Sequence, residues 1–211
     1  MTDIPKMDTD TLTMTTQTEP GSAIARAAMI DSQLRTSGVN EEFALARMMA
    51  VPREEFLPAD KQALAYIDRS VAVSGGALAS PLFYGKALIE AVPTRDDSVL
   101  VVEGGTGYLA ALLAPMIGAL DTLSAEEAVA ETVPQAKYSL IMIDGAIEAL
   151  PSALATSLME NGRIVSGLLL RQVTRLATGR KVAGQVTLQP VEDLGIPVLH
   201  PFDAPKKWTF S

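Results

Sequence analysis

A glycine-rich turn is the segment of this chain whose residue types most suggest ligand binding. Residues 103–107 follow a short apolar run, residues 99–102, and precede a second apolar stretch, residues 108–117. The glycines of the turn are Gly104, Gly105 and Gly107. Such a turn lets backbone N–H groups and the first turn of a helix approach a bound ligand. One glycine-rich turn is weak evidence for any particular cofactor, so a purely structural turn is the alternative interpretation.

Residue types that bind metals or act as strong nucleophiles are scarce. The chain has no cysteine, which excludes disulfides, zinc–thiolate sites and thiol catalysis. His200 is the only histidine, and no cluster of carboxylates surrounds it in the sequence. We therefore predict no metal site and interpret His200 as a structural residue.

The charge of the chain argues against two classes of partner. The formal net charge is -8 and the sequence pI is about 4.7. Nucleic acids and anionic membrane surfaces both attract Lys and Arg, so we expect neither as a partner. The longest uncharged, mostly apolar run, residues 107–120, has about 14 residues, whereas a membrane-spanning helix needs roughly 20. The N-terminus lacks the basic start and apolar core of a signal peptide, and we expect a cytoplasmic protein.

The elements that would position the glycine-rich turn alternate between strands and helices. Apolar runs at residues 99–102, 138–143 and 164–170 predict buried parallel strands. Helices are predicted at residues 108–117 and 151–160, the second with a proline in its first turn. Strand–turn–helix units in series predict an α/β fold with a doubly wound parallel sheet.

Helices dominate the chain before this α/β part. Ser22 can cap a helix that Gly38 ends, and Asn40 can begin a second helix that Pro52 breaks. Pro81 opens a third helix.

The first residues of the chain stand apart in composition. Residues 1–21 are rich in Thr and Asp, show no helix or strand period, and close with Pro20-Gly21. A disordered tail is one interpretation, and an extended arm held by a partner is the other. We therefore divide the chain into an extended tail (1–21), an N-terminal helical region (22–98) and a core with a C-terminal β segment (99–211).

Residues 29–69 carry spaced motifs that are typical of one enzyme family. They read QLR at 33–35, GV at 38–39, VPRE at 51–54, F at 56, P at 58, and AY.D at 65–68. In this order the segment resembles the N-terminal region of the protein-L-isoaspartate O-methyltransferases, and the resemblance extends over about residues 24–205. It implies a Rossmann-like fold of the S-adenosylmethionine-dependent methyltransferases.

The resemblance also implies a chemistry and a set of site residues. These enzymes use S-adenosylmethionine to methylate the misplaced carboxyl group of an isoaspartyl residue, and the ester then cyclises to a succinimide that can reopen to aspartate. Because the carboxylate is already a nucleophile, the protein mainly orients and desolvates the reactants. By resemblance, Ser80 is the candidate catalytic residue, and Gly104, Gly105 and Gly107 are candidate cofactor-binding residues. Ser80 can equally cap the helix that comes after it.

The cofactor side of the chain departs from the family pattern. Val101 stands where the family has a strand-end acid, Glu103 replaces a glycine of the turn, and Ser124 stands where an acid pairs with the ribose. Roughly 25 residues of the pattern, about one helix–strand unit, are absent near residues 127–137. Asp144 can replace the acid of the adenine-binding loop or cap the next segment.

These departures predict a shortened sheet and a loss of catalysis. We expect a non-catalytic relative of the methyltransferases that serves as an accessory or scaffold subunit of a larger protein complex, with residues 1–21 as its attachment arm. A respiratory complex is one candidate by analogy, which would place the chain on the cytoplasmic side of a membrane-bound assembly. The alternative is an active S-adenosylmethionine-dependent methyltransferase that repairs L-isoaspartyl residues. A third hypothesis is a protein that binds isoaspartyl or acidic peptides without modifying them.

Overall fold

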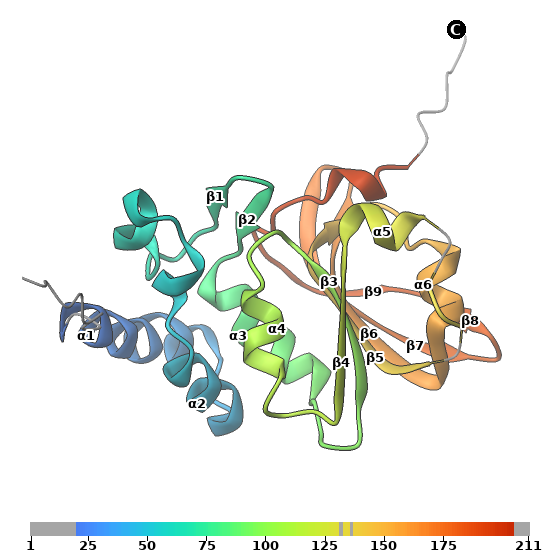
Figure 1. Ribbon diagram of the computed structural model, residues 1–211, viewed down its shortest axis with the longest axis horizontal. Helices are drawn as coiled ribbons and strands as arrows, with labels where there is room; N and C mark the ends of the chain where they lie inside the picture. The colour runs from blue at the N-terminus through green and yellow to red at the C-terminus, as the bar shows by residue number, and fades with distance from the viewer. Residues whose placement is uncertain (1–19, 131–132, 136, 205–211) are drawn as a thin grey trace, which may run out of the picture.

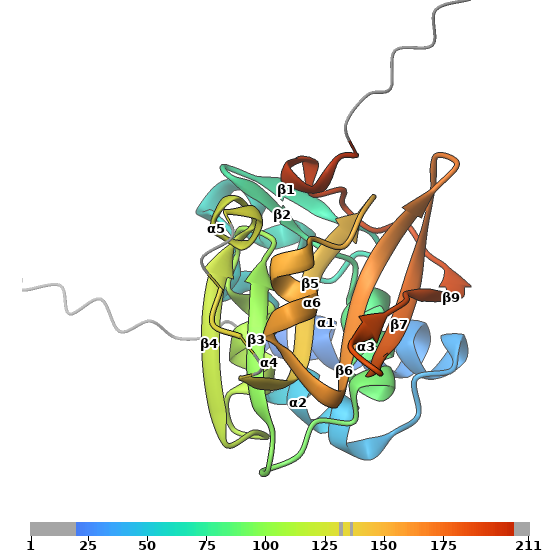
Figure 2. The same cartoon turned by 90° about the vertical axis from the view of Figure 1, so that its right-hand side faces the viewer.

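The computed structural model describes residues 20–130, 133–135 and 137–204. Most of the predicted tail and residues 205–211, the end of the predicted core, lie outside these residues. The described chain forms an N-terminal helical part, a two-stranded hairpin, and a seven-stranded sheet with helices on both faces (Figures 1 and 2).

The N-terminal part is a series of short helices. α1 (Pro20–Met29) continues as a π-helical turn, η1 (Ile30–Leu34), and a 3-10 turn, η2 (Arg35–Ser37); α2 (Glu42–Ala50), η3 (Arg53–Phe56) and η4 (Ala59–Leu64) come next. Gly38 ends the first helical run in a left-handed conformation with φ 84°, as predicted. Two predicted helix starts are wrong. α1 begins at Pro20 rather than Ser22, since proline suits a first turn, and Glu41 takes the N-cap position of α2 that Asn40 was expected to hold.

A β-hairpin and the helix after it connect the helical part to the sheet. β1 (Val71–Val73) pairs antiparallel with β2 (Gly76–Leu78). α3 (Pro81–Ala91) begins as predicted, with Pro81 in its first turn. The Phe83 N–H donates a hydrogen bond to the Ser80 hydroxyl oxygen at 3.3 Å, so Ser80 is the N-cap of α3.

The seven-stranded sheet is parallel at one side and antiparallel at the other. Its order is β4-β3-β5-β6-β7-β8, and β9 also pairs with β7. The strands are β3 (Ser98–Glu103), β4 (Ala119–Ser124), β5 (Tyr138–Ile147), β6 (Leu158–Leu170), β7 (Val173–Val182), β8 (Gln185–Val186) and β9 (Gln189–Asp193). β3 to β6 run parallel, whereas β7 pairs antiparallel with β6, β8 and β9. The three predicted strands fall within β3, β5 and β6, which confirms the α/β class.

Three short helices connect the parallel strands: α4 (Tyr108–Leu113), α5 (Ala125–Val129) and α6 (Ser152–Ser157). The two helices predicted here are longer than the observed ones. Residues 158–160 belong to β6 instead of α6, because buried Leu158 pairs with Tyr138 in the sheet. Among the described residues between β4 and β5, α5 is the one helix, and β4 forms the edge of the sheet. The connection from β4 to β5 thus contains no further strand among the described residues.

Alternating side chains of β3 separate two hydrophobic cores. Val99 and Val101 pack with residues of α3, α4 and the N-terminal helices, whereas Leu100 and Val102 pack with residues of α5 and α6. All four side chains are fully buried, as expected for a central strand with helices on both faces. The first core includes residues of both predicted regions, 22–98 and 99–211.

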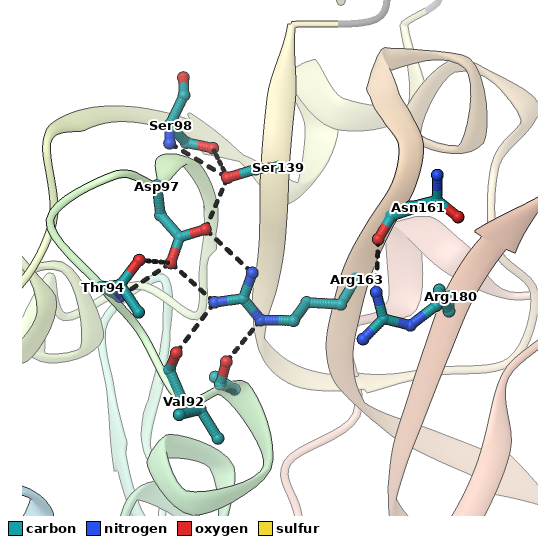
Figure 3. Close-up of polar contacts among 9 residues, drawn as sticks. Val92, Thr94, Asp97, Ser98, Ser139, Asn161, Arg163 and Arg180 are labelled. Atoms are coloured by element: carbon teal, nitrogen blue, oxygen red, sulfur yellow. Dashed lines mark hydrogen bonds and ion pairs between the residues drawn. The ribbon is translucent and has the colours of Figure 1, made fainter.

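An ion pair between half-buried Arg163 and buried Asp97 joins the amino ends of the strands to the end of α3 (Figure 3). The Arg163 guanidinium donates to both carboxylate oxygens of Asp97, at 2.9 and 2.7 Å, and to the Ala91 carbonyl oxygen at 2.5 Å. Asp97 also accepts hydrogen bonds from Thr94 and Ser139. Burial alone would raise the pKa of Asp97, but the hydrogen bonds from Arg163 and Ser139 outweigh it and hold the pKa well below its usual value. This network fixes the far end of the sheet, away from the glycine-rich turn.

Candidate functional site

The candidate site lies at the carboxyl ends of the parallel strands. The chain passes from β3 to β4 on one side of β3, and β5 then pairs with the other side. In open α/β sheets ligands bind where the strand order reverses in this way. The glycine-rich turn comes after β3 at this point and leads into α4, with Gly105 at φ 101° and Gly107 at φ 74°. The structure thus places the predicted glycines where the topology favours ligand binding.

The β1–β2 hairpin lies close to the carboxyl end of β3 in Figure 1. Its glycines are in direct contact with those of the turn. A Cβ atom at Gly76 would lie 1.9 Å from the Gly104 carbonyl oxygen, and one at Gly105 would lie 2.5 Å from the Gly75 carbonyl oxygen. The Ala77 N–H donates to the Gly104 carbonyl oxygen at 3.0 Å. No larger residue would allow this approach of the two backbones.

The Glu103 carboxylate accepts a hydrogen bond from a backbone N–H group of the turn. Its Oε2 atom accepts a hydrogen bond from the Gly107 N–H at 3.0 Å. Burial raises the pKa of Glu103, and the bond from Gly107 partly offsets this. An N–H group that could face a ligand anion is therefore satisfied by the chain itself.

Asp144 lies beneath the turn, in β5, and is buried without a hydrogen-bond partner for either carboxylate oxygen among the described residues. A Cβ atom at Gly104 would lie 2.2 Å from the Asp144 carbonyl oxygen, so the two segments are in direct contact. The pKa of Asp144 is raised to about 7, mainly by burial and also by the charge of Glu103, whereas Tyr84 and the charge of Arg53 lower it in part. The predicted cap at Asp144 is not formed, because this residue lies within the strand.

A buried arginine, Arg53, acts electrostatically on this carboxyl group, because its positive charge lowers the pKa of Asp144. Arg53 is fully buried, donates to the carbonyl oxygens of Ala65 and Ala79 at 2.7 Å each, and lies 5.4 and 5.0 Å from the ring centres of Tyr84 and Tyr108. Its Nη1 atom and the Tyr108 hydroxyl have no hydrogen-bond partner among the described residues. In the sequence Arg53 stands out only as part of a motif and Tyr84 not as a site residue, since their meeting depends on the tertiary fold.

At the end of β4, Ser124 has a structural role. The Glu127 N–H donates to its hydroxyl at 3.1 Å, and the Ser124 N–H donates to the Glu127 carboxylate at 2.8 Å. This reciprocal capping box begins α5.

Ser80 lies apart from the three glycines, at the wall of a cavity of about 450 Å³. The cavity is lined by Asp68, Arg69 and Ser70 before the hairpin, by Ser80 and Leu82 at the start of α3, and by Thr174 and residues 194–197. None of the three glycines lines it. The structure therefore brings Gly104, Gly105 and Gly107 together in one turn and places Ser80 in a separate cavity.

S-adenosylmethionine, the cofactor that the resemblance implies, can be tested against these residues. The methionine carboxylate of the cofactor would approach the turn, where the Glu103 carboxylate already accepts a hydrogen bond from a backbone N–H group. The two carboxylates would repel each other, by roughly 1–4 kcal/mol at a separation of about 4 Å. The ribose of the cofactor would meet Ser124, which caps α5, instead of a carboxylate. By the family pattern its adenine needs a unit beyond β4, and β4 is the sheet edge of the described chain. The glycine-rich turn suits such a ligand, but the residues around it do not fit, so no step of methyl transfer can be derived from them.

Metal binding and membrane insertion have no support in the described residues. These residues contain no group of three or more His, Asp or Glu side chains placed to hold a metal ion. No helix in the described ranges is long and apolar enough to cross a membrane.

Comparisons of sequence point to one family. The model of the protein-L-isoaspartate(D-aspartate) O-methyltransferases matches residues 25–134. The chain is 30% identical over 198 residues to a protein-L-isoaspartate O-methyltransferase of Koribacter versatilis, a match that covers 82% of this chain and 89% of the relative. It is 31% identical over 165 residues to another from Methylorubrum populi, which covers 67% of this chain and 78% of the relative.

The fold is shared with solved structures. A crystal structure described as a protein-L-isoaspartate O-methyltransferase of Plasmodium falciparum in complex with S-adenosyl-L-homocysteine matches with a TM-score of 0.61 and 16% identity, over 81% of this chain and 96% of that one. At this identity the likeness concerns the fold alone, which is that of the S-adenosylmethionine-dependent methyltransferases. With the sequence matches across most of its length, the chain belongs to the protein-L-isoaspartate O-methyltransferase family.

Proposed function

We propose that this chain recognises L-isoaspartyl residues in proteins and holds the misplaced carboxyl group in the cavity beside Ser80. The observation that carries the proposal is this cavity, whose volume of about 450 Å³ lies within the usual range of ligand pockets. Ser80 stands at the start of α3, where the positive end of the helix dipole favours a negative charge. Its oxygen accepts from Phe83, which leaves the O–H group available to donate to a carboxylate.

Repair by methyl transfer from S-adenosylmethionine is the first candidate for the outcome of this recognition. The relatives named as protein-L-isoaspartate O-methyltransferases support it, because the match extends over 82% of this chain and includes the Ser80 segment and the glycine-rich turn. This support is more direct than that for any other function. In such a reaction the cofactor would supply the methyl group, and the part of this chain would be to bind and orient the isoaspartyl carboxylate.

Recognition without catalysis, as an accessory subunit of a larger complex, is the second candidate. Three observations favour it: the Glu103 carboxylate within the turn, the use of Ser124 as a helix cap, and the position of β4 at the sheet edge. Residues 1–21, which lie largely outside the described residues, would be the attachment arm.

Calorimetry separates the two candidates. The purified chain is titrated with S-adenosyl-L-homocysteine and with a pair of peptides that differ only in an isoaspartyl or an aspartyl residue, and methyl transfer to each peptide is measured. Micromolar binding of the nucleoside together with methylation of the isoaspartyl peptide would establish repair and rule out the non-catalytic role. Preference for the isoaspartyl peptide without nucleoside binding at millimolar concentration would establish recognition without catalysis, whereas the accessory role also requires a protein partner. Equal binding of both peptides, or of neither, would refute the proposed function itself.

The accessory role has its own test. A chain purified at native abundance should bring down a stoichiometric protein partner, and deletion of residues 1–20 should release that partner while the chain stays folded. Purification of the full chain without a partner would contradict this candidate.

A further inference from the structure

Two neighbouring cavities share lining residues that come directly before the hairpin in the sequence. The cavity beside Ser80 and a second one of about 270 Å³ are both lined by Arg69 and Ser70. The second cavity is further lined by side chains of η4 and the segment leading into β1, among them Lys61, Leu64 and Ile67. Arg69 therefore stands at the junction of two hollows on one surface.

The junction carries positive charge that the chain does not neutralise. Arg69 is exposed, and its side chain forms no hydrogen bond or ion pair with another described residue. Lys61 contributes a second cation to the smaller cavity and donates to the Ala72 carbonyl oxygen at 2.6 Å. No acidic residue lines the smaller cavity among the described residues, and Asp68 lines only the larger one. In a chain with a net charge of -8, this is a local excess of positive charge that favours an anionic group.

Apart from Ser70 and the two cations, the residues that line the smaller cavity are apolar. Leu64 keeps 37% of its surface exposed, and Ile67 and Val71 also line the cavity. Such a surface gains free energy when an apolar side chain covers it.

We propose that the two cavities form one groove for an extended peptide, and that Arg69 selects an acidic residue beside the isoaspartyl residue. The isoaspartyl carboxyl group lies beside Ser80, the acidic side chain lies at Arg69, and an apolar side chain beyond it covers Leu64. The substrate class is thus an acidic segment with an adjoining apolar residue. This inference rests on the proposed recognition of isoaspartyl residues, but it needs neither S-adenosylmethionine nor methyl transfer.

The test is a binding experiment with labelled isoaspartyl peptides of one sequence that carry glutamate or glutamine next to the isoaspartyl residue, on either side. Dissociation constants are measured by fluorescence anisotropy for the wild type, for Arg69→Gln and for Arg95→Gln. Arg95 is a suitable control because it is exposed and unpaired among the described residues but lies in the loop before β3, at the other end of the sheet. Both substitutions remove one exposed positive charge, and neither removes a contact that holds the fold.

We expect the wild type and Arg95→Gln to bind the glutamate peptide about two- to fivefold more tightly at low salt, which corresponds to the upper part of the range for an exposed ion pair. Arg69→Gln should lose this preference while keeping its affinity for the glutamine peptide, and the preference of the wild type should shrink at about 0.5 M salt. The groove would be refuted, and the proposed function kept, by either of two results. In one, Arg69→Gln keeps the preference for the glutamate peptide; in the other, the wild type binds both isoaspartyl peptides equally. Failure of the wild type to bind either isoaspartyl peptide would refute the proposed function, and the groove with it.

Discussion

Replacing Asp144 by asparagine should change how the stability of this protein depends on pH. The buried carboxyl group has a pKa of about 7 in the folded chain, whereas a carboxyl group in an unfolded chain titrates near 4. Between these values the folded state keeps a proton that the unfolded state has released. The free energy of unfolding therefore falls as pH rises through this window, by about 1.4 kcal/mol per pH unit. From pH 5 to pH 7 the loss from Asp144 amounts to about 2 to 3 kcal/mol.

Asparagine keeps the shape of the side chain but does not titrate, so Asp144→Asn should remove this loss. Urea unfolding of both proteins at pH 5, 6, 7 and 8 gives the difference in unfolding free energy at each pH. The substitution can lower stability at every pH because an amide is buried without a partner, but the difference should shift in favour of the variant by about 2 to 3 kcal/mol between pH 5 and 7. Asp60→Asn, at an exposed position in η4, is the matched control for replacing an aspartate by asparagine. Parallel curves for Asp144→Asn and the wild type would refute the assignment of a raised pKa to this carboxyl group.

Three further predictions address the ion pair, the hairpin and the helix cap. Arg163→Met leaves Asp97 buried without its cation and should lower the free energy of unfolding by about 3 to 5 kcal/mol. If urea unfolding shows a loss of less than about 1 kcal/mol, the result would contradict the network of Figure 3. Gly76→Ala places a methyl group 1.9 Å from a carbonyl oxygen and should displace the hairpin, so that the amide of the next residue exchanges its hydrogen faster; unchanged exchange would mean that the contact is not tight. Ser80→Ala and Ser124→Ala each remove a helix cap and should each cost about 1 kcal/mol. Under the proposed function only the substitution at Ser80 should also weaken isoaspartyl peptide binding, and equal binding by both variants would count against that role.

The strands were predictable because their signal is local. Residues 99–102 form an uninterrupted apolar run, and such a run suits a parallel strand that is covered on both faces. The cap at Ser80 was predictable for the same reason, since serine followed by proline marks the start of a helix within a few residues. Helix ends were harder to predict, as the early end of α6 illustrates: pairing of Leu158 with Tyr138 decides it, and this pairing joins distant parts of the chain.

The surroundings of the candidate site depend on contacts that the residue types alone do not reveal. Glu103 is recognisable in the sequence as part of the turn, but the hydrogen bond that brings its carboxylate back onto Gly107 is not. The contact of Gly76 with Gly104 is equally hidden, because each glycine alone is compatible with an ordinary turn. The contact of Arg53 with the rings of Tyr84 and Tyr108 cannot be predicted either, since the three residues lie in separate helical segments.

The position of β4 at the sheet edge has a consequence for solubility. An edge strand offers unpaired backbone groups to any other extended chain, and natural proteins guard such edges with charged side chains. On β4 the guard is Asp121, which accepts hydrogen bonds from Lys137 at 2.5 Å and from the Tyr138 hydroxyl at 2.8 Å. A chain with a further strand beyond this point would need no such guard, since its backbone groups would already be paired. Because β4 lies at the sheet edge, protection of this edge against aggregation depends on Asp121 and its two hydrogen-bond partners.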